Sequence, residues 1–201
     1  MASSEGAGGG LSQEKLERKQ RILAGRATGV TESIADAVVA KSENLFFVFQ
    51  KNGNVPLAGE HGFGLYYNDC RYLSGYELKM GGRDPRLLVS DASKGFMCIS
   101  QLSNPEIEEG EGDGAPMDEI GVTWRRLVDS SDITLHDSLE FMNYGRDRAT
   151  FPISLHFECD FRDVFAIRGL WPHQPGTARA PRWEEDSLIF GYDGADGIKR
   201  R

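Results

Sequence analysis

Carboxylates and arginines lie close together at two places in the sequence, a combination that could serve acid–base chemistry. Asp69 and Arg71 are two residues apart, and Asp160 and Asp163 are followed by Arg168. Hydrolysis of a glycosidic bond needs two carboxyl groups about 5–9.5 Å apart, one acting as acid and one as base or nucleophile. The same residues can also form a network of ion pairs and turn caps that holds strand ends together. We favour this structural role over direct catalysis, because ionic networks are also common where no reaction occurs.

Aromatic residues form a second candidate site. Tyr66 and Tyr67 are adjacent, and Trp171 precedes a proline at the edge of a loop. Aromatic rings can stack on sugar rings, although they fill hydrophobic cores more often. We therefore consider Trp171, Tyr66 and Tyr67 as candidate carbohydrate-binding residues. Trp124 lies in an alternating segment, and we expect it in the core.

The other motifs do not indicate a metal, phosphate or nucleophile site. The histidines form no H-E-x-x-H pattern and the cysteines no C-x-x-C pattern, so we predict no metal and no cofactor. The glycines Gly59, Gly62 and Gly64 precede a strand-like segment, which lacks the helix N-terminus that binds phosphate. Cys159 alternates with apolar residues, and we expect it to be buried and inert.

Charge and cysteine usage exclude several classes of partner. The chain of 201 residues has a net charge of -8 and no dense run of lysine and arginine, whereas nucleic-acid binding depends on basic patches. No apolar run approaches the ~20 residues that cross a bilayer, so we expect neither a nucleic-acid nor a membrane partner. The cysteines are three in number and far apart, which indicates a reducing cytoplasm and no disulfide framework.

Short alternating segments separated by turn residues must position these candidates. Residues 1–32 are expected to be a disordered or helical extension, and residues 33–201 a single β-domain. Strands are expected over 35–41, 45–50, 66–78, 86–90, 120–128, 133–141, 153–161 and 187–192, with Gly81-Gly82 as a tight hairpin. Residues 104–119 are expected to form an exposed acidic loop and residues 172–182 another loop. The pattern predicts an all-β fold, an antiparallel β-sandwich.

Five segments together resemble one known family, the N-terminal domain of bacterial and archaeal glycogen debranching (amylo-alpha-1,6-glucosidase-like) enzymes. They occur in the same order as in that family. Two positions depart from its pattern: Cys70 stands where threonine is usual, and Ala166 where glutamate is usual. The segments that carry the resemblance are Gly64–Ser74, Leu102–Pro105, Leu139–Gly145, Asp160–Gly169 and Phe190–Arg200.

The resemblance implies a supersandwich-like domain from a glycoside hydrolase of inverting glucosidase type. In such enzymes an (α/α)6 catalytic domain follows and carries the acid and the base, so the partner expected here is the catalytic domain of the same parent enzyme. The β-domain is then non-catalytic and braces or shapes the sugar cleft. Two alternatives remain open: a module that binds α-glucan itself, and a structural or oligomerisation domain without a ligand.

Overall fold

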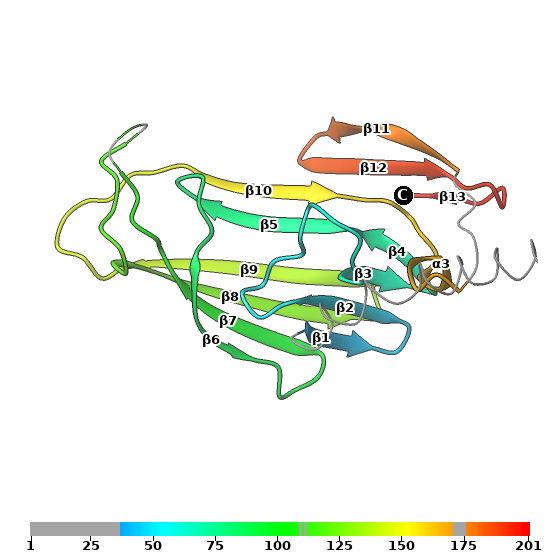
Figure 1. The fold of residues 1–201 in the computed structure, drawn as a ribbon, viewed down its shortest axis with the longest axis horizontal. Coiled ribbons are helices and arrows are strands. Elements are labelled where there is room, and N and C mark those ends of the chain that lie inside the picture. Colours follow the sequence, from blue (N-terminus) through cyan, green and yellow to red (C-terminus); the bar gives the residue numbers. More distant parts are fainter. Residues whose placement is uncertain (1–36, 109, 111, 171–175) are drawn as a thin grey trace, which may run out of the picture.

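A computed structural model describes residues 37–108, 110, 112–170 and 176–201 (Figure 1). These residues form thirteen strands and one short helix. The elements are β1 (Ala37–Ser42), β2 (Leu45–Gln50), β3 (Gly64–Tyr67), β4 (Cys70–Leu73), β5 (Gly75–Met80), β6 (Arg86–Asp91), β7 (Met97–Ser103), β8 (Ile120–Asp129), β9 (Thr134–Asn143), β10 (Ile153–Glu158), α3 (Val164–Ile167), β11 (Thr177–Glu184), β12 (Ser187–Asp193) and β13 (Lys199–Arg200). The predicted all-β fold with antiparallel sheets is confirmed.

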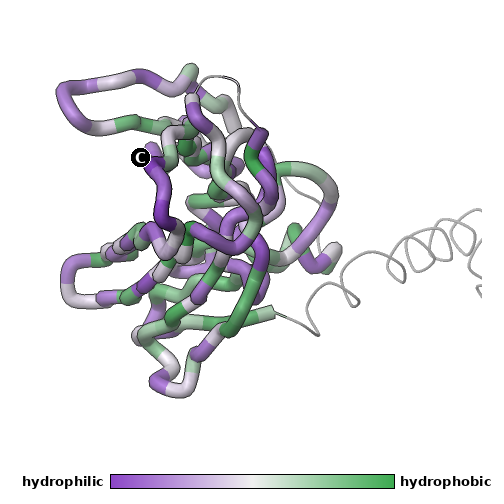
Figure 2. Tube along the Cα trace, turned by 90° about the vertical axis from the view of Figure 1, so that its left-hand side faces the viewer, coloured by the Kyte–Doolittle hydropathy of each residue, from purple (hydrophilic) through white to green (hydrophobic). Residues whose placement is uncertain are grey.

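Two layers of strands enclose the main core. One layer holds the sheet β1-β2-β3-β4 and the pair β10-β5, and the other is the sheet β6-β7-β8-β9. In Figure 1 the pair β10-β5 continues the line of the first sheet. Every pairing within these sheets is antiparallel. Viewed from the end of the strands, the connecting loops are mainly hydrophilic (Figure 2), as expected for segments that face water.

Alternation along the strands explains which side chains fill the core. In β2, Leu45, Phe47 and Phe49 are buried while the residues between them are only partly buried, the two-residue period of a half-buried strand. Trp124 of β8 faces them from the other layer, is 1% exposed, and contacts the Tyr76 ring at 5.4 Å between centroids. Trp124 is therefore a core residue, as predicted.

A charged side chain lies inside this core. Arg126 of β8 is 2% exposed, and its guanidinium carbon lies 3.7 Å from the centre of the Trp124 ring. Its Nε donates to Asp137 of β9 at 3.2 Å, and its Nη1 donates to the Gly53 carbonyl. The guanidinium carbon also lies 4.9 Å from the centres of three further rings, those of Phe47, Phe49 and Tyr76. A buried cation is stable only where such partners replace its water.

The C-terminal strands form a third, smaller sheet in the order β11-β12-β13. Most of its residues are exposed, and Tyr192 is the one residue of β11–β13 that is buried. Tyr192 stacks on Phe161 with 5.2 Å between ring centroids. Cys70, Phe161 and Tyr192 thus form a second core, separate from the first.

Three expectations about the elements were wrong. Residues 66–78 are divided among β3, β4 and β5, because Asn68 and Asp69 adopt positive φ angles and turn the chain. Gly81-Gly82 does form a turn, with a bridge between Met80 and Arg83, but β5 and β6 then enter different sheets. Residues 177–182, expected in a loop, belong to β11, which is paired with β12.

The expectation of an exposed acidic loop over residues 104–119 was partly confirmed. The acidic segment 104–119 is exposed over most of its length, yet Asn104, Ile107 and Ala115 are buried. Asn104 explains part of this, because its side chain receives a bond from the Ile120 N–H at 2.7 Å and donates to the Pro116 carbonyl. The expected extension 1–32 lies outside the described residues. Among the described residues, no helix has the length and apolar character to cross a membrane.

Candidate functional site

The predicted polar network is built around Arg71, which β4 places beside Asp160. The hairpin of β3 and β4 has a two-residue turn in which Asn68 and Asp69 have φ angles of 45° and 62°, the conformation of a type I′ turn. The turn sets a register that pairs Tyr66 with Arg71. Arg71 therefore lies on the same face of the hairpin as the buried Tyr66, and its side chain is only 5% exposed.

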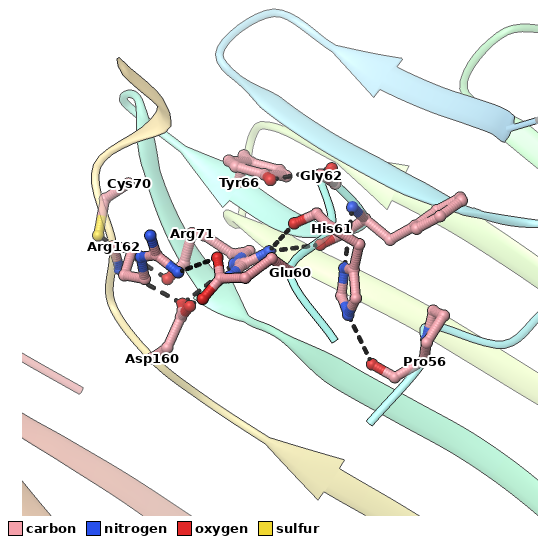
Figure 3. Close-up of polar contacts among 10 residues, drawn as sticks. Pro56, Glu60, His61, Gly62, Tyr66, Cys70, Arg71, Asp160 and Arg162 are labelled. Carbon is pink, nitrogen blue, oxygen red and sulfur yellow. Dashed lines mark hydrogen bonds and ion pairs between the residues drawn. The ribbon is translucent and has the colours of Figure 1, made fainter. Parts of the chain in front are cut away.

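Arg71 forms a two-pronged ion pair with Asp160. Its Nε donates to Asp160 Oδ1 at 3.1 Å, and its Nη2 donates to Oδ2. Its Nη1 donates to the carbonyls of His61 and Phe63 at 2.7 and 3.1 Å (Figure 3). Burial disfavours the charged form of Arg71, but the bonds to Asp160 outweigh it, and the pKa of Arg71 is raised. The guanidinium thus stays charged and uses its fork geometry fully.

A second ion pair lies beside the first. Arg162 Nη1 donates to Glu60 Oε2 at 2.8 Å, and the Arg162 backbone N–H donates to Asp160. The bond to Arg162 and its charge lower the pKa of Glu60. Glu60 is therefore ionised near neutral pH, which removes it as a general acid. Its side chain is 79% exposed, so this pair contributes little stability.

Phe161 links the two pairs through an unusual backbone conformation. Its φ angle is 52°, a left-handed value that costs roughly 1–2 kcal/mol for a residue with a side chain. Packing compensates, because the ring stacks on Tyr192 and meets the Tyr72 ring edge-on at 5.6 Å. The bend places Asp160 against Arg71 while the next carbonyl, that of Arg162, accepts the Arg71 backbone N–H at 2.8 Å.

His61 fastens the loop before β3. The Phe63 N–H donates to its Nδ1 at 3.3 Å, and its Nε2 lies 2.8 Å from the Pro56 carbonyl oxygen. A neutral ring with its proton on Nε2 satisfies both bonds. Burial lowers the pKa of His61, which favours this neutral form. The ring therefore serves as a positioning group and the loop is held on two sides, by His61 and by Arg71.

The other members of the predicted network take local roles. Asp69 is exposed in the turn, and its backbone carbonyl accepts the Val164 N–H at 2.8 Å. Asp163 caps α3, accepting the Phe165 N–H at 2.7 Å. Arg168 ends α3, with its backbone N–H bonded to Val164 and Ala166 and its side chain exposed. Of the residues predicted to form the network, Arg71 and Asp160 are the pair whose side chains bond to each other.

The predicted sugar-stacking residues lie in different surroundings. Tyr66 is buried, with its ring stacked on Phe46 at 4.8 Å and its hydroxyl bonded to the Gly62 carbonyl. Tyr67 is partly buried in the same strand. Trp171 lies outside the described residues. Trp183 of β11 was not predicted as a candidate, yet its side chain is 71% exposed.

An apolar cavity of about 320 Å³ separates the C-terminal sheet from the main body. Its walls include Tyr72, Phe161, Leu188 and Phe190. Sugar hydroxyls need hydrogen-bonding partners when they leave water, and walls of this kind offer few. Cys159, which was expected to be buried, is only partly buried and lines the cavity. Desolvation still raises its pKa to about 12, so its thiol stays protonated and is a poor nucleophile.

Asp129, Asp132 and His136 place possible metal-ligand atoms within 4.8 Å of one another at the turn between β8 and β9. Asp132 and His136 are exposed, and Asp129 Oδ1 already accepts bonds from the N–H and the hydroxyl of Ser131. Those bonds account for the position of Asp129 without an ion. The cluster therefore gives no reason to assign a metal site.

Gly64, the first residue of β3, packs closely against Arg71, so a substitution at Gly64 tests how tightly the polar network is packed. Gly64 has φ 139°, and a Cβ there would overlap the Leu73 carbonyl oxygen and lie 2.7 Å from Arg71 Cδ. Gly64→Ala should therefore lower the free energy of unfolding by about 2–3 kcal/mol, since both the backbone angle and the space oppose a side chain. Urea denaturation followed by tryptophan fluorescence measures this loss.

Gly59 is the matched control, because it has φ 95° but no atom within 4 Å of the position that a Cβ would occupy. Gly59→Ala should cost only the backbone term, about 1 kcal/mol. Equal losses for the two variants would show that the contact with Arg71 and Leu73 does not matter.

Comparison with known proteins agrees with the family resemblance of the sequence. The family model for the N-terminal domain of (some) glycogen debranching enzymes matches residues 41–201. This range contains the hairpin with Arg71, the segment with Asp160 and the C-terminal sheet. No curated protein and no solved structure gave a match. The match covers most of the chain, and the chain belongs to the family of N-terminal domains of glycogen debranching enzymes.

Proposed function

We infer that this chain is a non-catalytic part of a debranching-type glycoside hydrolase. In this proposal it braces or shapes the sugar cleft of an (α/α)6 catalytic domain that belongs to the same parent enzyme. The observation that carries the proposal is the family match over residues 41–201. The free cysteines Cys70, Cys98 and Cys159 support a place in the reducing cytoplasm.

The state of the carboxylates supports a non-catalytic role. Asp160 uses both oxygens on Arg71, and Asp163 caps α3. Glu60 is held ionised by Arg162. A glycosidase acid must instead keep its proton near neutral pH, through a raised pKa. These three carboxylates are therefore better suited to fixing the loop before β3 and the segment after β10.

Direct binding of α-glucan is the second candidate function, and the exposed indole of Trp183 favours it. An exposed ring can stack on a sugar, as we expected of Trp171 and Tyr67. The buried ring of Tyr66 is less suited, because Phe46 covers one of its faces. The bracing role ranks first, because it does not require an open sugar site on this chain.

Calorimetric titration of the purified chain with maltooligosaccharides and glycogen tests the ranking. We expect no saturable heat at millimolar sugar and no release of glucose in a parallel assay, because the acid and base would lie on the catalytic domain. Release of glucose by the chain would contradict the non-catalytic role. Saturable binding that Trp183→Ala abolishes, and that exposed Tyr144→Ala leaves intact, would favour the binding module instead.

A further inference from the structure

The core face of β10 is only partly covered by the described residues. β10 pairs with β5 so that Ile153, Leu155 and Phe157 lie opposite Met80, Leu78 and Tyr76, and directly paired residues share a face of the sheet. The three β5 residues are at most 5% exposed, whereas Ile153, Leu155 and Phe157 are 46%, 40% and 37% exposed. The Phe157 ring still contacts the Tyr76 ring, with 4.6 Å between the ring centroids. This apolar face is therefore continuous with the main core.

The opposite layer stops short of this face. Its last strand, β9, pairs with β8 and with no other strand of the described residues. Figure 1 shows β10 displaced beyond the free edge of β9 when the layers are viewed face-on. Phe141 of β9 points to the core side, since it pairs with buried Val122, and yet it is 37% exposed. As far as the described residues go, the sandwich is thus open along the side between β9 and β10.

The opening requires an extended strand. β9 pairs on one side only with a described strand, and an added strand would satisfy the backbone donors and acceptors of its free edge in series. To cover β10, that strand must also direct alternate apolar residues inward. β10 itself has this composition, with apolar Ile153, Leu155 and Phe157 separated by polar Ser154 and His156, and it too lies at a sheet edge.

We propose that a second copy of this chain closes the sandwich, in a two-fold dimer in which β10 of each copy pairs with β9 of the other. β9 runs toward the connection 144–152 and β10 runs away from it, so the two strands have opposite directions (Figure 1). A two-fold axis parallel to the strands preserves these directions, and β10 of the partner then lies antiparallel to β9. The uncovered faces of the two β10 strands pack against each other, which gives the self-complementary contact of a two-fold dimer.

The side chains of β9 suit this partner in one register. Placing Leu155 of one copy opposite Leu139 of the other keeps these two leucines on the core side. Phe157 then lies opposite Asp137, whose carboxylate is bonded to Arg126. The same register sets Ile153 opposite Phe141. On the outer face it sets Glu158 opposite His136, whose ring N–H can donate a hydrogen bond to the carboxylate.

The two edges carry few of the features that keep free edges apart. Monomeric sheet proteins protect an edge with lysine, proline or an inward-pointing charge. The strands β9 and β10 contain no lysine and no proline. Asp137 is the one inward charge of β9, and it is already bonded to Arg126. The edges are therefore free to pair.

Sedimentation equilibrium of the full chain over a concentration series tests the proposal. We expect a monomer–dimer equilibrium, and Leu155→Lys should weaken it by roughly tenfold or more, because it buries a charge between the copies. Leu88→Lys on β6, at the far edge of the same layer as β9, is the control and should leave the dimer intact. A wild-type chain that stays monomeric at its highest soluble concentration would overturn the proposal.

A crosslink tests the register and does not depend on how the lysine variant folds. In the double variant Leu139→Cys/Leu155→Cys, the new thiols of different copies lie opposite each other, within the Cα separation of about 4.4–6.8 Å that a disulfide tolerates. Oxidation should yield a covalent dimer on a non-reducing gel, while Leu88→Cys/Leu155→Cys should yield none. Absence of the Leu139–Leu155 crosslink in a chain that sediments as a dimer would rule out this pairing.

Discussion

Arg126→Ala should lower the free energy of unfolding by about 3–5 kcal/mol, the usual cost of breaking a buried ion pair by removing one partner. The substitution removes the guanidinium that is packed among Trp124 and three other rings. It also leaves Asp137 without its cation and the Gly53 carbonyl without this donor. Since whole domains are stable by only about 5–15 kcal/mol, this loss is a large fraction of the total stability and should be easily measured at 25 °C. Urea denaturation followed by circular dichroism measures the loss.

Arg125→Ala is the matched control, one residue earlier on the same strand. Arg125 points away from the core, is 47% exposed, and pairs with Glu140 at 2.9 Å. Exposed pairs contribute about 0–1 kcal/mol, so this variant should unfold within 1 kcal/mol of wild type. Similar losses for the two variants would mean that the buried position of Arg126 carries no special energy.

Arg126→Met separates the volume of the side chain from its charge. Methionine refills much of the cavity and needs no hydrogen-bonding partner, so its cost should lie below that of alanine. Buried ionic groups are often replaced by apolar residues at little cost. If methionine proved as destabilising as alanine, the bonds to Asp137 and Gly53 would account for the whole effect.

Local alternation in the sequence was enough to predict much of the fold. The run Leu45–Gln50 forms β2 at the expected bounds, and the expected strand 120–128 corresponds to β8 (Ile120–Asp129). In β8 alternate residues from Ile120 to Val128 are buried, so Trp124 could be assigned to the core from its position alone. β11 was missed because its residues are almost all exposed and include a proline, so no apolar period marks it.

The same alternation indicates that Arg126 points into the core. Arg126 lies two residues from Trp124 and from Val128, on the inward face of a strand that was predicted correctly. A charge at an inward position must be paired, so the position alone indicated a buried partner. What the sequence did not indicate is the identity of that partner, because Asp137 belongs to the neighbouring strand and its pairing depends on the register.

The candidate site shows the limit of reasoning from short spacings. Asp69 and Arg71 are two residues apart in the expected strand 66–78, and in a continuous strand they would share a face. Asp69 instead occupies a turn with positive φ, which interrupts the alternation. The partner of Arg71 is Asp160, 89 residues away, and that of Arg162 is Glu60, 102 residues away. Such pairs depend on how the layers pack, and periodicity within one segment carries no information on that.

The ion pair of Arg71 and Asp160 affects the stability of more than one part of the chain. Arg71 joins three parts of the chain: the loop before β3 through two carbonyls, β4 through its own backbone, and the segment after β10 through Asp160. The last of these leads into α3 and the C-terminal sheet. Loss of the ion pair should therefore loosen the attachment of residues 159–163 before it affects the main core, and amide hydrogen exchange measures this order.

Asp160→Asn should lower the free energy of unfolding by about 3–5 kcal/mol, although the two side chains have nearly the same shape. The amide cannot accept two bonds from the Arg71 fork, and the cation that remains is only 5% exposed, so its charge is left buried without compensation. Urea denaturation gives the loss. Glu60→Gln, which removes a carboxylate that is 79% exposed, should change stability by less than about 1 kcal/mol.

The double variant Arg71→Met/Asp160→Asn decides whether the loss comes from the unpaired charge. With the guanidinium gone, Asp160→Asn leaves no buried cation, so its added cost should be smaller than in the wild-type background. Directly bonded residues give coupling energies of about 0.5–3 kcal/mol, and we expect a value near the upper end because the pair is bidentate. Strict additivity of the two single losses would show that Arg71 and Asp160 act independently, and that other bonds hold the loop before β3 and the segment after β10 in place.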